Sequence, residues 1–451
     1  MLRPRRIDIA AALAHPVRLL PLAFGALIVL GTILLYIPVM RAGEKSPTFM
    51  DALFTATSAV TVTGLTTADI GTYWSTPGHV VILILVEIGG IGIIAMATVI
   101  GVFVGGGLGL RTQLAVQMDM HVVNIGEVAP LFKRVAITMG IFQGTSTVLL
   151  TLRYHGQYFD SWGEAAWHGL FDSVMAFNNA GFSLHSDSLA RYAGDFLVII
   201  PISMVVFFGA VGFPVLAELN RRWRTPSRWT IHTRLTVFGS VGLAIVGTLA
   251  FLAFEWTNPA TLGSQGMSDR LVTAFEAGIM PRSGGLASFD WSQVTGPTQN
   301  LVSIMMFIGG GSASTAGGIK ITTFLLLGYV ILAELRGDPE VRIGVRSIGS
   351  ATIRTALSIA LIAIALVSAA SMALMLVSDA EYADIMFDVC SAFGTVGLST
   401  GVTASVGTAG ELILIVLMFI GRVGTVTAAS TFLLRKKQQR FHLPEERPII
   451  G

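Results

Sequence analysis

Apolar runs alternate with short, half-polar segments along the whole chain. Runs long enough to cross a bilayer as a helix recur throughout, at 19–36, 79–104, 196–216, 237–254 and 356–377. Four of the intervening segments begin with a phenylalanine and end, ten residues later, at a glycine in a polar loop. At about 1.5 Å per helical residue, such a segment cannot cross about 30 Å of hydrocarbon. The pattern predicts a polytopic membrane protein in which these segments enter and leave on one side.

The polar loops align as four copies of one sequence pattern. Their glycines, at spacings of 117, 104 and 112 residues, are Gly64, Gly181, Gly285 and Gly397. The phenylalanines ten residues before them are Phe54, Phe171, Phe275 and Phe387. A second match follows each glycine 22 to 26 residues later and reads EIGGIGI, FFGAVGF, FIGGGSA and FIGRVGT. The chain is therefore predicted to be four copies of one unit.

Each unit is predicted to hold a helix, a short pore loop and a second helix. We place the units at 1–105, 106–219, 220–334 and 335–434, with a cytoplasmic tail at 435–451. Irregular backbone at membrane depth is tolerated only where it is buried in protein or lines a water-filled cavity. Four such loops around one axis would form a pore, where their carbonyl oxygens replace the water shell of a cation. The predicted fold class is all-α, with four helix–pore loop–helix repeats in pseudo-fourfold symmetry around a central ion pore.

The glycines have a second interpretation. Glycine allows the positive φ that a loop needs to turn its carbonyls toward an axis, but small residues also let membrane helices pack closely. For the four loop glycines we favour the pore interpretation, because a packing motif does not need a phenylalanine at a fixed offset. For GGIGI and FFGAVGF in the second match, both interpretations stay open.

Composition supports a membrane protein and removes several alternatives. Hydrophobic residues make up 53% of the chain and charged residues 12%, with a mean hydropathy of +0.72, outside the range of ordinary globular proteins. The single cysteine, Cys390, excludes an internal disulfide and a thiolate metal cluster. The sequence contains no HExxH or GxSxG motif and no GxGxxG after a strand-like run. An intramembrane enzyme and a nucleotide-binding domain within this chain are therefore not predicted.

Charged residues predict the orientation. Twenty-one lysines and arginines lie on the face that holds both termini, whereas the opposite face carries six: Arg41, Lys45, Arg153, Arg191, Arg270 and Arg282. Because basic loops stay in the cytoplasm, we expect both termini to be cytoplasmic and the pore loops to open outward. Acidic residues near the pore loops would concentrate cations at this mouth, or they are solvated loop charges and helix caps. They include Asp51, Asp69, Asp172, Asp187, Glu276, Asp384 and Asp388.

These features together resemble the Trk/Ktr/HKT superfamily of potassium transporters, most closely its Ktr membrane subunits. The resemblance covers nearly the whole chain and rests on SAVTVTGLTT, FNNAGFS, PRSGGLAS, FGTVGLST, FIGGGSASTAGGIKITTF and FIGRVGTVT. It implies a single potassium pathway, with glycine rather than serine at Gly64 going with preference for potassium over sodium. The implied selectivity filter consists of Val62, Thr63, Gly64, Asn179, Ala180, Gly181, Ser283, Gly284, Gly285, Thr395, Val396 and Gly397. The third loop, PRSGGL, departs from the threonine and alanine that are common before this glycine in the family.

The resemblance also implies a gate in a break of the second helix of unit three, at 309–318. The implied gate residues are Gly310, Gly311, Ser312, Ala313, Ser314, Thr315, Ala316 and Gly317, with Arg422 as the inner-pore arginine. A glycine-rich stretch is a poor helix interior, since each glycine costs about 1 kcal/mol relative to alanine, and broken helices mark ion pathways. The alternative is a flexible kink without a gating role. We expect Lys320 to reach toward the cytoplasmic interface, and for Glu87 a buried hydrogen bond and a pore role stay open.

The leading hypothesis is a potassium uptake subunit in the plasma membrane that is not an enzyme. It would bind potassium and no organic cofactor in this chain, with sodium left open as a second ion. The alternative is a secondary transporter that couples potassium to sodium or protons by alternating access. The resemblance implies a homodimer and a cytosolic, RCK-type nucleotide-binding regulatory subunit that responds to ATP and ADP. The remaining expected partner is the lipid bilayer, and no nucleic acid is expected.

Overall fold

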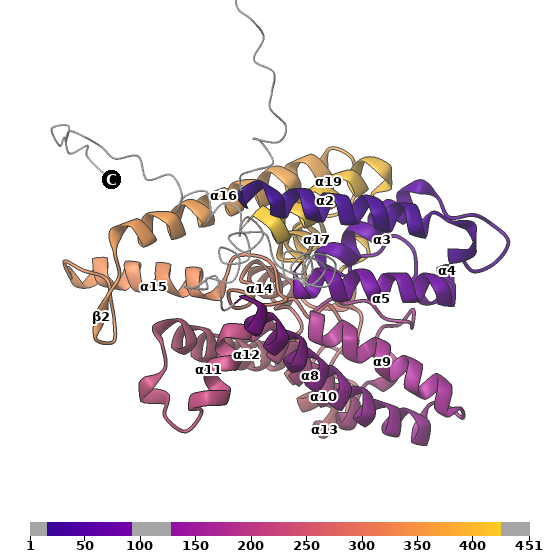
Figure 1. Ribbon diagram of the computed structural model, residues 1–451, viewed down its shortest axis with the longest axis horizontal. Coiled ribbons are helices and arrows are strands. Elements are labelled where there is room, and N and C mark those ends of the chain that lie inside the picture. Colours follow the sequence, from indigo (N-terminus) through magenta and orange to yellow (C-terminus); the bar gives the residue numbers. More distant parts are fainter. Residues whose placement is uncertain (1–15, 93–127, 425–451) are drawn as a thin grey trace, which may run out of the picture.

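The computed structural model of the protein describes residues 16–92 and 128–424, and it is almost wholly helical. The colours of Figure 1 follow the sequence and run around a central region from indigo to yellow. The first and last repeats therefore lie side by side, with α3 (Phe49–Thr61) in contact with α19 (Gly407–Phe419). The predicted unit boundary at 105 and the predicted tail at 435–451 lie outside the described residues.

Each of the four repeats contains an outer helix, a short pore helix and a second helix. In repeat one these are α2 (Pro16–Leu35), α3 and α5 (Thr76–Ile91). In repeat two they are α8 (Val128–Gln157), α9 (Trp162–Asn178) and α10 (Phe196–Val211). In repeat three they are α12 (Ile231–Glu255), α13 (Met267–Ile279) and α14 (Gly296–Phe307), and in repeat four α16 (Ser350–Met375), α17 (Tyr382–Gly394) and α19. Short helices in the connections are η1 (Pro38–Met40), α4 (Ile70–Tyr73), η3 (Ala190–Tyr192), η4 (Pro226–Arg228), η5 (Trp291–Gln293) and α18 (Val402–Ser405).

The pore helices α3, α9, α13 and α17 are 13 to 17 residues long, longer than the ten-residue pattern that predicted them. The first two, α3 and α9, begin at capping side chains, whereas α13 and α17 have no side-chain cap. The hydroxyl of Thr48 accepts the N–H of Asp51 at 3.1 Å, and Ser161 caps α9 through the N–H of Gly163. Even at 17 residues a helix is about 25 Å long, so none of them crosses a bilayer of about 30 Å.

The outer helices supply most of the membrane spans. Within the described part of the chain, four helices are long and apolar enough to cross a membrane: Lys133–Gln157, Ile231–Glu255, Ser350–Met375 and Gly407–Gly424, where α19 continues into the π-helix η6 (Ile420–Gly424). Large aliphatic side chains such as Leu249 and Leu361 stand exposed on these helices, at 60% and 58%. An apolar surface of this extent is suited to face the lipid of a membrane and not water. This confirms the predicted polytopic membrane protein.

The apolar run at 196–216, predicted as one spanning helix, is broken. Helix α10 ends at Val211, and α11 (Phe213–Arg222) leaves at an angle of 101°. Gly212 at the bend has a φ of 100°, and a Cβ atom there would lie 2.7 Å from the carbonyl oxygen of Ser312. The N–H of Phe213 donates to the carbonyl of Ala313 at 3.2 Å. The helix turns because a loop of repeat three occupies the space where it would continue.

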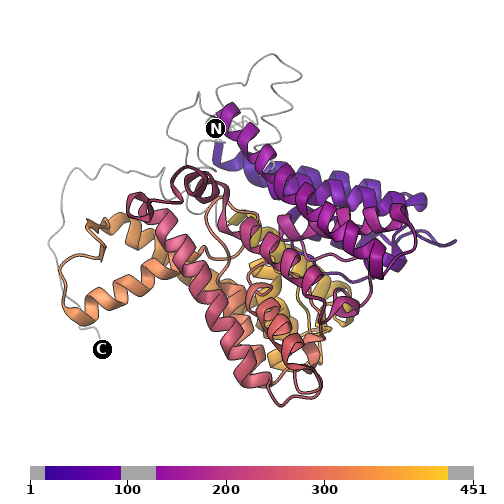
Figure 2. The same cartoon turned by 90° about the horizontal axis from the view of Figure 1, so that it is seen from below.

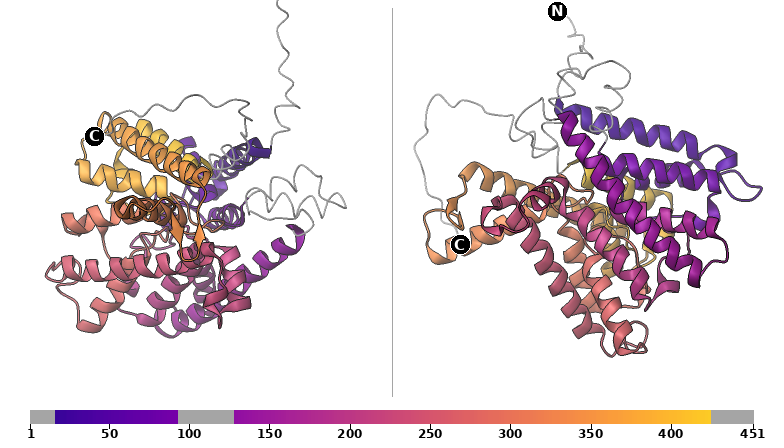
Figure 3. Two further views of the ribbon diagram at one scale, coloured as in Figure 1. Left: turned by 90° about the vertical axis from the view of Figure 1, so that its left-hand side faces the viewer. Right: turned by 60° about the horizontal axis from the view of Figure 1, so that its bottom comes forward.

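The second helix of repeat three is interrupted where the sequence predicted a break. Helix α14 ends at Phe307, a non-helical loop follows, and α15 (Ile321–Arg336) resumes. The loop begins and ends in a parallel bridge between Ile308 and Ile319. Beyond α15, the hairpin of β1 (Arg342–Ile343) and β2 (Arg346–Ser347) leads into α16, and this part projects from the bundle (Figures 2 and 3).

The buried side chains form separate clusters around the axis. One cluster unites α2, α3 and α5 with the end of α9, another unites α8, α9 and α10 with α13, and a third unites repeat four with α12 and α14. Each cluster thus joins neighbouring repeats. The centre of the molecule is left to the loops that follow the pore helices.

Candidate ion pathway

The four loop glycines form a closed ring. A Cβ atom on Gly64 would lie 2.8 Å from the Cα of Gly181, and one on Gly181 would lie 2.9 Å from the Cα of Gly285. A Cβ on Gly285 would lie 2.2 Å from the carbonyl oxygen of Val396, and one on Gly397 would lie 3.1 Å from the Cα of Gly64. The loops therefore meet in chain order, and the fourth meets the first. The twelve residues predicted as a filter lie in these loops.

Each loop has the same unusual backbone. The φ angle is positive at the glycine, between 69° and 98°, and also at the residue two positions before it. These earlier residues are Val62, Asn179, Ser283 and Thr395, with φ values of 57°, 60°, 78° and 48°. A residue with a side chain in this conformation costs about 1 to 3 kcal/mol, and it persists only where the surroundings enforce it. The same strain in all four copies indicates that the loops serve a common purpose.

The hydrogen bonds of the loops determine where their carbonyls point. The N–H of Gly64 donates to the Ser58 hydroxyl at 3.0 Å, and the N–H of Thr63 donates to the Ser58 carbonyl at 2.8 Å. In the fourth loop Gly397 donates to the Ser391 hydroxyl at 3.1 Å. Because the N–H and C=O of a trans peptide point in opposite directions, carbonyls such as that of Thr63 face away from the pore helix. They are turned toward the ring.

The second glycine match places each second helix against the end of a pore helix. A Cβ atom on Gly89 would lie 2.2 Å from the carbonyl oxygen of Val60. The same contact recurs at Gly209 with Phe177 and at Gly421 with Phe393, both at 2.1 Å. In repeat three, a Cβ atom on the corresponding glycine, Gly309, would instead lie 1.8 Å from the carbonyl oxygen of Gly317. The close-packing interpretation of these glycines is therefore correct, and repeat three is the exception.

The predicted gate loop lies directly against three of the loops predicted to form the filter. The Thr315 hydroxyl is 3.0 Å from the side-chain amide of Asn179 in the second loop. The N–H of Gly317 donates to the Ser283 hydroxyl of the third loop at 3.3 Å. A Cβ on Gly317 would lie 2.2 Å from the Thr395 hydroxyl of the fourth loop. The eight predicted gate residues thus form a segment beneath the ring.

Two cationic side chains hold the carbonyls of this segment. The guanidinium of Arg422 donates to the carbonyl of Thr315 and, at 2.9 Å, to the carbonyl of Gly89. The ammonium group of Lys320 donates to the carbonyl of Ala316 at 2.6 Å. The sequence led us to expect Lys320 to reach toward the cytoplasmic interface, but its side chain instead turns back to the loop. Arg422 joins repeats one, three and four at a single point.

Glu87 takes part in a buried hydrogen-bond network. Its carboxylate accepts the side-chain amide of Asn178 at 2.7 Å and that of Gln143 at 2.9 Å. Asn178 is the last residue of the second pore helix, and it directly precedes the predicted filter residue Asn179. Of the two roles left open for Glu87, the structure places it in the hydrogen-bonded one, bracing repeat one against repeat two.

Three of the acidic residues near the pore loops are buried behind the predicted filter loops and not exposed at a mouth. Asp172, Glu276 and Asp388 each follow the repeated phenylalanine, and each is 0% exposed. Glu276 accepts the N–H of Ser288 at 2.8 Å and also the hydroxyl of that serine. Asp388 accepts the N–H and hydroxyl of Thr403 at 2.8 and 2.6 Å, and further bonds from Ser399 and Thr400. In repeats three and four a carboxylate therefore clamps the segment after the filter to the pore helix.

Repeat two lacks this clamp. The carboxylate of Asp172 accepts the hydroxyl of Tyr154 on α8 at 2.7 Å, and its second oxygen has no partner among the described residues. Repeat one carries Thr55 at the same position. From the sequence, these acids were either charges at the mouth or solvated loop charges and helix caps. Their buried partners were missed because they lie 11 to 18 residues away and follow no fixed pattern.

Arg282 was counted among the basic residues of the outer face, and that assignment is wrong. Its side chain is 3% exposed and lies behind the third filter loop. The guanidinium donates to the carbonyl and hydroxyl of Ser240 on α12, at 3.1 and 3.0 Å. This buried arginine directly precedes the predicted filter residue Ser283, so the third loop has a positive charge at its back.

On the side where the pore helices begin, His185 follows the second filter loop. Its ring stacks on that of His168 at 4.7 Å, and its Nε2 lies 3.0 Å from the hydroxyl of Tyr192. Burial, followed by repulsion from Arg191, lowers the pKa of His185 to about 4. His185 is therefore neutral near pH 7 and adds no positive charge to the mouth.

Comparisons with known proteins agree with this architecture. A family model described as TrkH, cation transport protein, matches residues 4–442. The chain is 36% identical to Ktr system potassium uptake protein B of Bacillus subtilis, and the alignment covers 97% of both chains. It is 32% identical to potassium/sodium uptake protein NtpJ of Enterococcus hirae, again over 97% of both. The crystal structure of the potassium transporter TrkH from Vibrio parahaemolyticus superposes with a TM-score of 0.71 at 18% identity, covering 96% of this chain and 87% of that one.

The carboxylate clamp can be tested with the single cysteine, because Cys390 is buried on α17 two residues after Asp388. We expect Asp388→Ala to loosen α17, since hydrogen bonds to a charged group contribute about 1.5 to 3 kcal/mol each. Labelling of Cys390 by a membrane-permeant maleimide should then become at least about tenfold faster.

The matched control is Asp172→Asn, which alters a buried carboxylate that clamps no segment after the filter. It should leave the labelling rate of Cys390 unchanged. Equal rates for wild type and Asp388→Ala would show that the clamp does not hold the pore helix.

Proposed function

Since the chain belongs to the TrkH family of cation transport proteins, we propose that it carries potassium ions into the cell through the centre of its four loops. The observation that carries this proposal is the closed ring of glycine loops, whose carbonyls face away from the pore helices. Carbonyl oxygens at an axis replace the hydration shell of potassium, and they discriminate by their number and field strength. Potassium is named for the relative in Bacillus subtilis, and together with sodium for the relative in Enterococcus hirae.

The proposed filter consists of the twelve loop residues named above. All seven of the non-glycine members are wholly buried. Their side chains therefore support the backbone and do not line an open vestibule. The repeated positive φ at Val62, Asn179, Ser283 and Thr395 favours this proposal, because strain of this kind gathers at ligand-binding sites. Bound potassium would be substrate at this site, and no organic cofactor is required.

We further propose that the loop at 309–318 is the gate and that Arg422 stabilises its closed position. A filter that conducts potassium would dissipate the gradient of the cell unless the pathway below it can close. The loop lies against three filter loops, and Arg422 donates to its carbonyl at Thr315. Glycine permits a wide range of backbone conformations, so this loop can adopt a second position at low strain.

The proposed orientation has both termini in the cytoplasm and the pore loops open to the outside. Removing Arg282 from the outer count leaves five basic residues there, so the bias toward the face of the termini becomes stronger. We propose a homodimer in the plasma membrane, regulated by a separate cytosolic RCK-type subunit that binds ATP and ADP. The basic end of α11, with Arg221 and Arg222, and the neighbouring loop form its proposed docking face.

A second candidate is coupled transport of potassium with sodium or protons. The relative in Enterococcus is named a potassium/sodium uptake protein, which favours a test of sodium coupling. In liposomes, a sodium gradient alone should not drive potassium accumulation if the protein is a gated pore. Uphill potassium uptake driven by that gradient would support the coupled mechanism.

The filter proposal predicts that Gly64→Ser weakens discrimination against sodium. A Cβ atom at Gly64 would lie 2.2 Å from the carbonyl oxygen of Ala180, so the side chain must displace a carbonyl of the ring. We expect the ratio of potassium to sodium flux in liposomes to fall about tenfold, which corresponds to about 1.4 kcal/mol. The matched control is Gly43→Ser, since Gly43 has a similar φ of 85° but no atom within 4 Å of its Cβ position. An unchanged ratio in folded Gly64→Ser protein would remove Gly64 from the filter.

The gate proposal predicts that Arg422→Ala and deletion of residues 312–315 each raise potassium flux in the absence of a regulatory partner. The first removes the donors to the Thr315 carbonyl, and the second removes the obstruction. Arg346→Ala, at an exposed arginine of the β1–β2 hairpin, is the control and should behave as wild type. Flux at or below the wild-type rate in both gate variants, with equal membrane abundance, contradicts the assignment.

The regulatory proposal predicts that the chain purifies from its native membrane with a cytosolic nucleotide-binding protein. Replacing ADP with ATP should then change potassium flux through the reconstituted complex, while the isolated chain should not respond. If the chain repeatedly purifies without any such partner and is fully active, the proposal of a regulated complex is wrong. The pore proposal is not affected by that result.

A further inference from the structure

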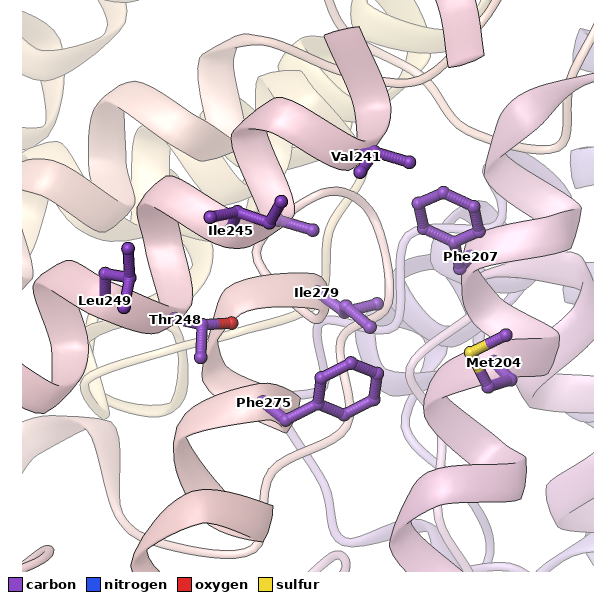
Figure 4. Close-up of a pocket in the computed structure, with 9 residues that line it drawn as sticks. Met204, Phe207, Val241, Ile245, Thr248, Leu249, Phe275 and Ile279 are labelled. Atoms are coloured by element: carbon purple, nitrogen blue, oxygen red, sulfur yellow. The ribbon is translucent and has the colours of Figure 1, made fainter. Parts of the chain in front are cut away.

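A cavity of about 350 Å³ lies between α10, α12 and α13, on the side of the third pore helix that faces away from the filter. Figure 4 shows Val241, Ile245 and Leu249 of α12 along one wall, and Met204 and Phe207 of α10 opposite them. Side chains of α13, including that of Phe275, form its floor. Several of the lining residues are exposed, so the cavity is a groove that opens on the surface of the spanning helices.

The lining of this groove continues along one face of α12 to a basic residue. Val241, Ile245 and Leu249 follow the i, i+4, i+8 spacing of a single helix face. Phe238, which is 65% exposed, lies on this face one turn earlier, and Arg234 lies a further turn before it. At about 1.5 Å per residue, Arg234 stands about 10 Å from the start of the groove and about 22 Å from its far end.

Tryptophans place Arg234 at the level of the membrane interface. The loop before α12 carries Trp223, which is exposed, and Trp229, whose ring lies 6.2 Å from that of Phe238. Tryptophan gathers at the headgroup level of a bilayer. The groove therefore begins below the headgroups and runs toward the middle of a hydrocarbon core of about 30 Å. At that depth the bilayer offers acyl chains, whose shape and chemistry match a long apolar groove.

We propose that this groove binds one acyl chain of an anionic phospholipid, whose headgroup lies at Arg234. The guanidinium carries five donors, of which one contacts the carbonyl of Ser227, and phosphate is a ligand that arginine favours. The acyl chain contacts α13 at Phe275 and α10 at Phe207. Val206, the neighbour of Phe207, packs against the filter residue Gly284, where a Cβ would lie 2.9 Å away. A bound lipid thus supports the third filter loop from behind.

The test compares two tryptophan variants on the same helix. Ile245→Trp fills the groove, whereas Val246→Trp places the same side chain on the adjacent face, and the two native residues have similar exposures of 53% and 55%. Each protein is incubated with vesicles of phosphatidylcholine and phosphatidylglycerol at 3:1, and the lipids retained after purification are counted by native mass spectrometry. We expect at least a threefold loss of retained phosphatidylglycerol for Ile245→Trp and none for Val246→Trp.

Two further variants complete the test. Leu249→Trp fills the other end of the groove and should reproduce the loss if Ile245→Trp disturbs folding. Arg234→Gln should reduce retained phosphatidylglycerol but leave retained phosphatidylcholine unchanged. Wild-type retention in both groove variants, or equal losses in Val246→Trp, overturns the proposal. If the groove variants retain lipid but no longer form a dimer, the proposal is wrong and the groove instead binds a second copy of the chain. These readouts measure lipid and not transport, so they stand apart from the proposed function.

Discussion

The whole structure depends on the close approach of main-chain atoms from different repeats at the central axis. Around the ring of loop glycines, and again where the second helices cross the pore-helix ends, main-chain atoms lie so close that a Cβ atom would overlap them. Irregular backbone can lie at membrane depth only if protein surrounds it. The long outer helices provide that enclosure, and the buried clusters between neighbouring repeats hold it together. Glycine at these crossings is therefore required for the architecture before any question of ion selectivity arises.

Repeat three departs from the symmetry of the other repeats at its pore helix and at its second helix. Its pore helix ends before Pro281 and Arg282, and the buried guanidinium is tied to α12 instead of to a neighbouring loop. Its second helix stops at Phe307, and Gly317 of the loop takes the position that a pore-helix carbonyl has elsewhere. The loop also forces α10 to bend at Gly212 in repeat two. One irregular segment thus explains both the break after Phe307 and the bend at Gly212.

The sequence predicted those features that repeat, and it missed those that depend on unique partners. A phenylalanine ten residues before each of four glycines was enough to find the pore helices and loops, because four copies reinforce one pattern. The bend at Gly212 was missed because the apolar run continues through it, and only the position of Ser312 reveals why it ends. Asp388 and Arg282 were placed at the surface because a charge looks the same in sequence whether water or Thr403 and Ser240 surround it. The roles proposed for the filter and gate residues remain predictions for experiment.

The closure of the ring also has a consequence for biosynthesis. Gly64 contacts both Gly181 and Gly397, so its loop is complete only when the fourth repeat is in place. Arg422 and Gly89 close the layer beneath across 333 residues of sequence. At about 5 to 20 residues per second, the ribosome needs roughly 17 to 67 s to make that stretch. During this interval the early loops hold strained, polar backbone without their final neighbours. The nascent chain must therefore keep them sheltered, by the insertion machinery or by non-native contacts, until the last repeat arrives.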